Sequence, residues 1–99
     1  MKVWLDDIRD PSVFATRDFL WAKTYSLCIT LLSGNEVSEI SLDNDLGEEK
    51  TGYDACRWLC EFCLDKGEDI PTYLVHSANP VGKKNIESYL ENFKKNLVG

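Results

Sequence analysis

The sequence predicts one small α/β domain in three layers, built on a four-stranded, mostly parallel sheet. Short apolar runs alternate along the chain with helical stretches, and this alternation is typical of a parallel sheet with right-handed crossovers. The 99 residues leave no room for a second core, so we expect residues 1–99 to form a single domain. Hydrophobic residues make up 43% of the chain, which is enough for a folded globule.

The first half of the chain contains three apolar runs that we expect to be strands, over residues 2–5, 19–23 and 37–42. Turn-forming residues follow the first run, and residues 10–18 are expected to form a loop. Between the second and third runs, Thr24 can cap a helix over residues 25–33, which stops at Gly34.

The second half begins with a helix over residues 52–66, which Thr51 is expected to cap. The helix ends at Gly67, because glycine tolerates the left-handed conformation of a helix end. Residues 71–75 are rich in strand formers and predict the fourth strand. Asn79 and Pro80 suit the cap and the first residue of a third helix. The apolar stripe of this helix consists of Ile86, Tyr89, Leu90, Phe93 and Leu97.

A sheet in the flavodoxin-like order 2-1-3-4 accommodates these elements. The carboxyl ends of its strands would meet at one edge, where open α/β sheets bind ligands. That edge would gather the acidic pairs Asp6-Asp7 and Asp43/Asp45 together with residues 76–79. The predicted fold therefore also predicts a functional site.

Four carboxylates at one edge would repel one another unless a divalent cation neutralised them. Carboxylate oxygens are hard ligands that suit Mg²⁺ or Mn²⁺, so we expect a metal site formed by Asp6, Asp7, Asp43 and Asp45. The alternative is that residues 43–45 only form a turn, since Asp and Asn bond their own backbone. A D-x-D motif alone is weak evidence, but a second acidic cluster at another strand end favours the metal site.

The only histidine, His76, follows the fourth strand, and an imidazole can act as a general acid or activate a water near neutral pH. A lone histidine is often a structural hydrogen-bonding residue, and this alternative stays open. The helix that starts at Pro80 would point free backbone N–H groups at the same place, as anion sites require. We expect His76, Asp43 and Ser77 to be catalytic. The expected phosphate ligands are Arg9, Ser77, Asn79, Lys83 and Lys84.

Two of the assigned or nearby residues have a second interpretation. Arg9 can either clamp a phosphate or pair with Asp7 or Asp10. Trp21 is expected in the core, but it is the tryptophan best suited to stack on a base if it is exposed at this edge.

The acidic composition limits the expected partners. A net charge of −6 opposes binding to a nucleic-acid polymer, whereas a metal ion and local cations can hold a small anionic phosphate or nucleotide. No apolar run approaches the ~20 residues of a membrane span, and no signal peptide is expected because Asp6 and Asp7 interrupt the first run. We therefore expect a cytoplasmic protein without membrane contact. The oligomeric state is not predicted.

Three cysteines, Cys56, Cys60 and Cys63, have the C-x₃-C-x₂-C spacing of radical S-adenosylmethionine enzymes. We reject a cluster because these thiols share one helical face with Leu59, and because the chain is too short for the barrel of those enzymes. Free cysteines behave as small buried hydrophobic residues, so these three and Cys28 are expected in the core, reduced as in other cytosolic proteins.

Four segments together resemble the cyclic-phosphate-processing receiver family: residues 5–9, 41–47, 51–54 and 76–82. The acidic pair after the first strand, Asp43 after the third and Ser77-Ala78 after the fourth are similar to response-regulator receivers in general. The resemblance covers nearly the whole chain. It implies a compact receiver-like fold, a bacterial or phage-infected host cell, and a proposed action on cyclic phosphates.

The sequence also departs from the receivers it resembles. Ordinary receivers have a fifth strand followed by a lysine that binds the aspartyl phosphate, and this sequence offers neither, so the fold is expected to be truncated. Lys83 or Lys84 would have to replace that lysine from another direction. The middle residue of the D-x-D motif is often His in the family but is Asn44 here, which leaves His76 as the only imidazole.

Three functions are consistent with these residues, and whether the protein is an enzyme stays open. The leading hypothesis is a metal-dependent phosphoesterase for a small cyclic phosphate or nucleotide signal, with Asp43 as a metal ligand or a nucleophile. The alternative is a binding module that holds such a ligand, or a partner, without turnover. A phosphoacceptor receiver in a relay is disfavoured, because the phosphoryl charge would lack its lysine.

Overall fold

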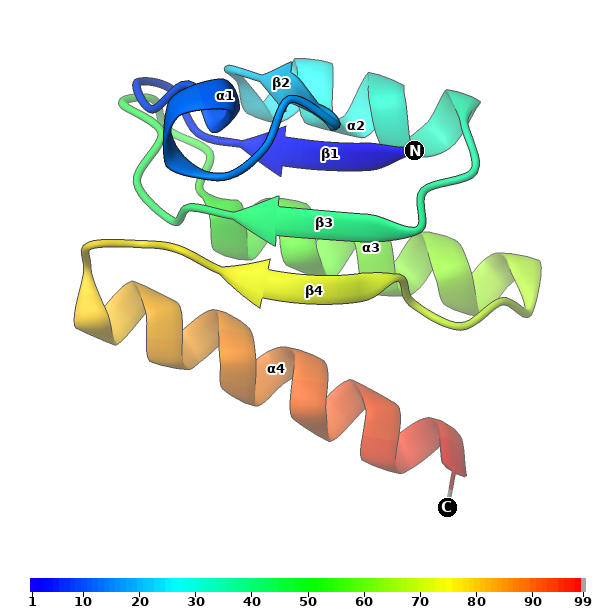
Figure 1. Ribbon diagram of the computed structural model, residues 1–99. Coiled ribbons are helices and arrows are strands. Elements are labelled where there is room, and N and C mark those ends of the chain that lie inside the picture. The colour runs from blue at the N-terminus through cyan, green and yellow to red at the C-terminus, as the bar shows by residue number, and fades with distance from the viewer. Residues whose placement is uncertain (99) are drawn as a thin grey trace.

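Four parallel strands form one sheet in the order β2-β1-β3-β4 in the computed structural model (Figure 1). The strands are β1 (Lys2–Leu5), β2 (Phe19–Ala22), β3 (Glu39–Leu42) and β4 (Thr72–Val75). Every pairing is parallel, so the predicted order and the α/β class are confirmed. The structure describes residues 1–98; the side chains of residues 96–98, including the predicted stripe residue Leu97, lie outside the described part.

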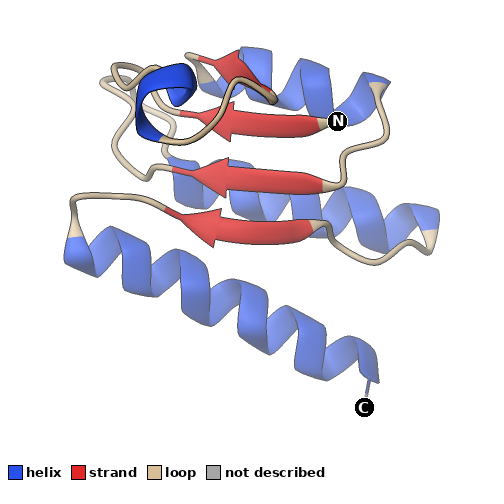
Figure 2. Cartoon of the chain, in the orientation of Figure 1, coloured by secondary structure: helices blue, strands red, loops and turns tan. Residues whose placement is uncertain are grey.

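The helices are α1 (Pro11–Phe14), α2 (Tyr25–Gly34), α3 (Gly52–Lys66) and α4 (Pro80–Val98). Helices α2 and α3 cover one face of the sheet, whereas α1 lies in front of the opposite face near β1 and β2 (Figures 1 and 2). Helix α4 runs along β4 and packs against α3. None of the described helices is long and apolar enough to cross a bilayer.

The core lies between the sheet and helices α2 and α3. Alternate residues of the two central strands, Val3, Leu5, Ile40 and Leu42, point into it and are at most 1% exposed. Each such side chain contributes about 1.5–3 kcal/mol on burial. The four cysteines are free and buried in the same core, which confirms their predicted place.

The capping residues act as the sequence predicts. The Thr24 hydroxyl accepts a hydrogen bond from the Leu27 N–H, and Thr51 forms a capping box with Asp54. Gly67 ends α3 with a φ of 69°, and its N–H is directed at the carbonyls of the last turn. Strand β1 has its predicted bounds, whereas β2, β3 and β4 are one or two residues shorter than predicted, since residues 23, 37, 38 and 71 lie outside them.

The segment predicted as a loop over residues 10–18 contains the one-turn helix α1, so that prediction is wrong for residues 11–14. The Asp10 carboxylate accepts a hydrogen bond from the Ser12 N–H at 2.9 Å, and Pro11 occupies the first turn, where its missing N–H costs nothing. Asp, Pro and Ser are common both in turns and at the start of a helix. The sequence alone therefore does not distinguish a loop from a one-turn helix here.

The sheet face opposite α2 and α3 is covered mainly by side chains and not by long helices. Trp4 on β1 and Ser41 on β3 point to this face and are only 4% and 1% exposed. The edge of the Phe19 ring covers Trp4 on one side. The His76 ring stacks on Trp4, so the single histidine is part of the cover of the sheet.

Candidate metal and phosphate site

Three of the expected carboxylates meet at the carboxyl edge of the sheet. Asp6, Asp7 and Asp43 each offer an oxygen atom, and these oxygens all lie within 4.8 Å of one another. The strand pairing continues one residue past β1 and β3, because the Asp6 N–H donates to the Ala22 carbonyl at 3.1 Å and the Asp43 N–H to the Leu5 carbonyl at 2.9 Å. The sheet itself therefore brings Asp6 and Asp43 side by side.

The Asp6 carboxylate is almost fully engaged. It is 1% exposed, and its Oδ1 accepts hydrogen bonds from the backbone N–H groups of Ile8 and Arg9 at 2.8 and 2.9 Å. Its Oδ2 faces Nε2 of His76 at 3.1 Å. Both oxygens of Asp6 thus have hydrogen-bond partners that fix the orientation of the carboxylate.

The Asp43 carboxylate is the opposite case. The residue is 8% exposed, and no described side chain or backbone N–H donates a hydrogen bond to its carboxylate, whose oxygens reach solvent. Carboxylates that lie this close together repel one another. Carboxylate oxygens from three side chains suit a hard divalent cation that keeps some of its waters, so the residues present fit Mg²⁺ or Mn²⁺.

Two glycines make this arrangement sterically possible. Gly47 has a φ of 66°, and a Cβ on it would lie 2.9 Å from Oδ2 of Asp7. A Cβ on Gly52 would lie 1.8 Å from the backbone oxygen of Asp43. The acidic loop and the start of α3 can therefore close on the carboxylates only because both residues lack a side chain.

Asp45 lies outside this cluster in the described residues, although the sequence suggested it as a fourth ligand. It is exposed, and its Oδ1 accepts hydrogen bonds from the amides of Asn44 and Asn79 at 3.3 and 3.5 Å. Its position two residues past Asp43 places it on the outside of the turn.

Asn44, between the two aspartates, contacts the first turns of helices α3 and α4. Its carbonyl accepts from the Gly52 N–H at 2.9 Å, and its side-chain oxygen accepts from the Tyr53 N–H at 3.3 Å. A Cβ on Gly82 of α4 would lie 2.6 Å from the Asn44 amide. These contacts support the interpretation of residues 43–45 as a turn, and the metal interpretation stays a prediction.

His76 is bonded at both ring nitrogens. Nδ1 lies 2.7 Å from the Ser41 hydroxyl, Nε2 lies 3.1 Å from Asp6, and the ring stacks on Trp4 at 3.9 Å between centroids and 8° between planes. Burial lowers the pKa of His76, and the hydrogen bond to Asp6 opposes this shift. The structural interpretation that the sequence left open is thus the one that this geometry favours. Ser41 was not anticipated, because a serine inside a strand carries no sequence signal.

The start of α4 differs from the expected anion site. The Asn79 side-chain oxygen accepts from the N–H groups of Val81 and Gly82, both at 3.1 Å, and the Asn79 carbonyl accepts from the Lys83 N–H at 2.9 Å. The expectation of free backbone N–H groups here is therefore wrong, since a good cap consumes the groups that an anion would need. Lys83 and Lys84 are exposed on the first turn.

Arg9 forms no ion pair with Asp7 or Asp10 in the described residues, and its role as a phosphate ligand stays a prediction. Its Nη1 donates to the His76 carbonyl at 3.0 Å, and its guanidinium lies 5.9 Å from the centre of the Phe14 ring. Trp21 lies beside the site, because its indole N–H donates to the Asp6 carbonyl at 2.7 Å. It is half-buried, with Lys23 Nζ at 4.3 Å from the ring centre.

A family model described as the cyclic-phosphate processing receiver domain matches residues 1–92. The chain belongs to this family. The resemblance stated from the motifs is thereby confirmed, and membership associates this receiver domain with cyclic-phosphate processing. No curated protein and no solved structure matches the chain.

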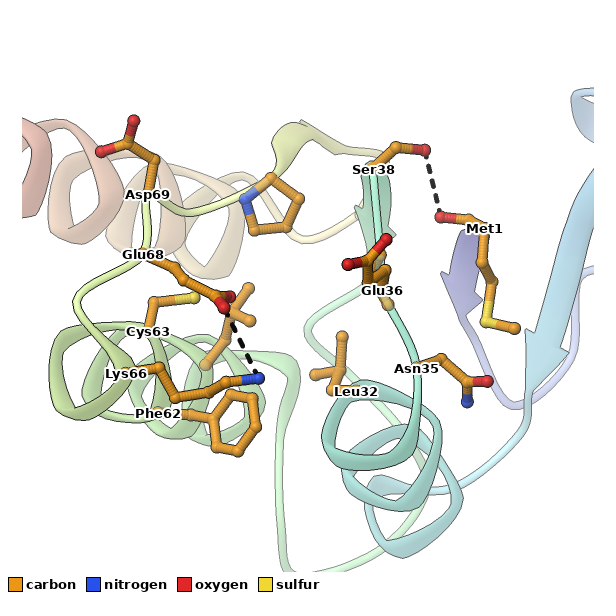
Figure 3. A pocket seen from close by; sticks show the side chains of 13 residues that line it. Met1, Leu32, Asn35, Glu36, Ser38, Phe62, Cys63, Lys66, Glu68 and Asp69 are labelled. Carbon is orange, nitrogen blue, oxygen red and sulfur yellow. Dashed lines mark hydrogen bonds and ion pairs between the residues drawn. The ribbon is translucent and has the colours of Figure 1, made fainter.

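Two hollows of this receiver domain lie away from the carboxylates. One of about 400 Å³ opens at the amino ends of the strands, between the ends of α2 and α3 (Figure 3). Leu32, Phe62 and Cys63 line it, and the Lys66–Glu68 ion pair lies at its side. The other, of about 220 Å³, lies between α2 and α3 around Tyr25, Arg57 and Trp58. Neither includes Asp6, Asp7 or Asp43.

Proposed function

We propose that this receiver domain holds one divalent cation, Mg²⁺ or Mn²⁺, at Asp6, Asp7 and Asp43, and that it binds and hydrolyses a small cyclic phosphate or nucleotide there. The observation that supports this proposal is the convergence of Asp6, Asp7 and Asp43, whose oxygens lie within 4.8 Å of one another, while the Asp43 carboxylate has no donor among the described residues. A cation would offset the cost of that charge. When bound, it would polarise the phosphoryl group and lower the pKa of a bound water.

The chain supplies several groups that can orient a phosphate next to these carboxylates. The Ser77 oxygen accepts a hydrogen bond from the Asn79 N–H, which leaves its own O–H free to donate. Lys83 and Lys84 are exposed on the first turn of α4, and Arg9 has four N–H donors beyond the one on the His76 carbonyl. In this proposal these residues bind the phosphate oxygens, and Asn79 holds the loop as a cap.

Proton transfer to the leaving oxygen stays a prediction for His76. A general acid must direct an N–H at the atom that it protonates. Because both ring nitrogens already face partners, the ring would have to release Ser41 or Asp6 first. A nucleophilic role for Asp43 is chemically open, since its carboxylate is unpaired.

The occupied imidazole also favours a second candidate function, a module that binds the ligand without turnover. Both His76 nitrogens and the first N–H groups of α4 are engaged, so neither of these groups is free to give a proton to a leaving oxygen. Such a module would retain the cation and the phosphate contacts but release the ligand unchanged.

Incubation with a panel of 2′,3′-cyclic and 3′,5′-cyclic nucleotides, with Mg²⁺, Mn²⁺ or a chelator, separates these functions. The enzyme hypothesis predicts that mass spectrometry finds at least one ligand that gains one water in a metal-dependent way. The binding hypothesis predicts stoichiometric retention and intact ligand after denaturation.

A variant at the opposite end of β3 from Asp43 provides the control. Asp43→Asn should abolish both turnover and retention, whereas Glu39→Gln, at the other end of β3, should preserve them. A protein that neither retains nor converts any member of the panel, with or without metal, contradicts the proposal.

A further inference from the structure

We propose that Ser41 is a positioning residue: its hydroxyl donates to Nδ1 of His76 and fixes the ring, so that Nε2–H holds the Asp6 carboxylate toward the cation. This inference rests on the cation site of the proposed function. It assigns a role to a strand residue that lies under the site, where it does not itself reach a ligand.

The direction of this hydrogen-bond chain follows from what each group can donate. Asp6 already accepts two backbone N–H groups at Oδ1, and an ionised carboxylate only accepts. The 3.1 Å contact at its Oδ2 therefore requires a proton on Nε2 of His76. In the neutral ring Nδ1 is then an acceptor, and the Ser41 hydroxyl at 2.7 Å is the donor that satisfies it.

The other contacts of the ring make the chain rigid. The His76 ring lies flat on Trp4, with 8° between the planes. The Trp4 indole N–H donates to the Arg9 carbonyl at 2.8 Å, and the Arg9 side chain donates to the His76 carbonyl at 3.0 Å. These contacts hold the ring in place, and with Nε2–H directed at Asp6 the Ser41 hydroxyl is the donor that satisfies Nδ1.

Ser41, His76 and Asp6 have the residue types of a hydrolase triad, but burial excludes that role. Ser41 is 1% exposed, and its oxygen lies under the imidazole, where no substrate atom reaches it. The hydrogen bonds run from the Ser41 hydroxyl through the His76 ring to the Asp6 carboxylate. Groups that orient metal ligands in this way typically change metal affinity by about 10- to 100-fold when removed.

The first test is the tautomer of His76 in the metal-free protein, measured by nitrogen-15 NMR at about pH 8, where a histidine is neutral. The inference predicts that wild-type His76 is the Nε2–H tautomer. Ser41→Ala should weaken this bias, because Nδ1 loses its donor. A wild-type ring protonated on Nδ1 overturns the inference without any variant.

The second test is Mn²⁺ affinity, measured by titration. Ser41→Ala should weaken binding by about tenfold, and Ser41→Thr, which keeps the hydroxyl, should restore both affinity and tautomer. Ser38→Ala removes an exposed hydroxyl that bonds the Met1 carbonyl at the other end of the sheet, and should change neither.

The two tests fail in different ways. If wild-type protein binds no Mn²⁺ but shows the Nε2–H tautomer, the proposed cation site is wrong while the hydrogen-bond chain stands. If Ser41→Ala is folded and binds Mn²⁺ as wild type does, Ser41 does not position Asp6. An affinity loss without a tautomer change, or one that Ser41→Thr shares, marks a purely structural effect and also contradicts the inference.

Discussion

Asp43 is the residue at which folding and the proposed function conflict. The residue is 8% exposed, and its carboxylate lies close to those of Asp6 and Asp7, which carry the same charge. Like charges at this separation repel in a partly buried site. The metal-free protein therefore carries a free-energy cost at Asp43 that a ligand can relieve.

Replacing Asp43 by Asn should stabilise the metal-free protein by about 1 kcal/mol, since one of three repelling charges is removed while size is kept. If the proposed cation site exists, Mg²⁺ should stabilise the wild-type protein, and the same change should remove this stabilisation. Urea unfolding with Mg²⁺ and with a chelator measures both effects. Asp45→Asn is the control, because Asp45 is exposed outside the cluster and should change stability by less than about 0.5 kcal/mol. A destabilised Asp43→Asn protein would contradict this account.

At the same scale, residue types were predictable from the sequence but their partners were not. Asp6, Asp7 and Asp43 follow strand ends, so topology alone gathers them. Arg9 and Asp45 instead bond groups that only the folded loops bring near, the His76 carbonyl and two side-chain amides. Such contacts depend on loop paths, which leave no periodicity in a sequence.

Among the elements, the start of α3 sets the position of Asp43. The Gly52 N–H donates to the Asn44 carbonyl, and the helix begins directly against the backbone of Asp43. The sequence signals for this helix, Thr51 as cap and Gly67 as end, predicted its bounds well because both act locally. The close approach at Gly52 is a tertiary contact and was not predicted.

Gly52→Ala should destabilise the protein by about 3 kcal/mol, because the new Cβ would lie 1.8 Å from the Asp43 backbone oxygen and the helix would have to move. Gly34→Ala is a matched control at the last residue of α2. A Cβ there meets nothing within 4 Å, and alanine is the better helix former, so it should stabilise by up to about 1 kcal/mol. Urea unfolding of both variants checks this, and equal effects would show that the close approach has no energetic weight.

For the molecule as a whole, strand order was predictable because alternating strands and helices allow few parallel topologies. The way in which the opposite sheet face, which bears Trp4 and Ser41, is covered could not be predicted. The sequence pattern predicts no long helix for this face, and His76 and the short helix α1 lie there instead. The core on the other face follows the expected alternation and contains all four cysteines.

Burial of the Cys28 thiol should make stability fall at alkaline pH. Burial raises the pKa of Cys28 from its ordinary 9.0 to about 12. The unfolded chain therefore loses this proton first, so the stability from the neutral buried thiol is complete below about pH 9 and declines as the pH rises toward 12.

The stability gap between wild type and Cys28→Ala measures this effect in chelator-containing buffer. The gap should narrow by about 1 kcal/mol between about pH 8 and about pH 10. Urea unfolding at both values determines it. A gap that is the same at both would mean that the thiol has its ordinary pKa in the fold.

The central claim is that Asp6, Asp7 and Asp43 together hold one divalent cation. The most direct measurement is anomalous diffraction from crystals of this protein grown with Mn²⁺. We expect a single strong anomalous peak at the carboxyl edge of the sheet, in contact with oxygens of all three aspartates. This peak should be lost in Asp43→Asn crystals. No peak there at saturating Mn²⁺, or a peak bound elsewhere with the three carboxylates turned apart, would contradict it.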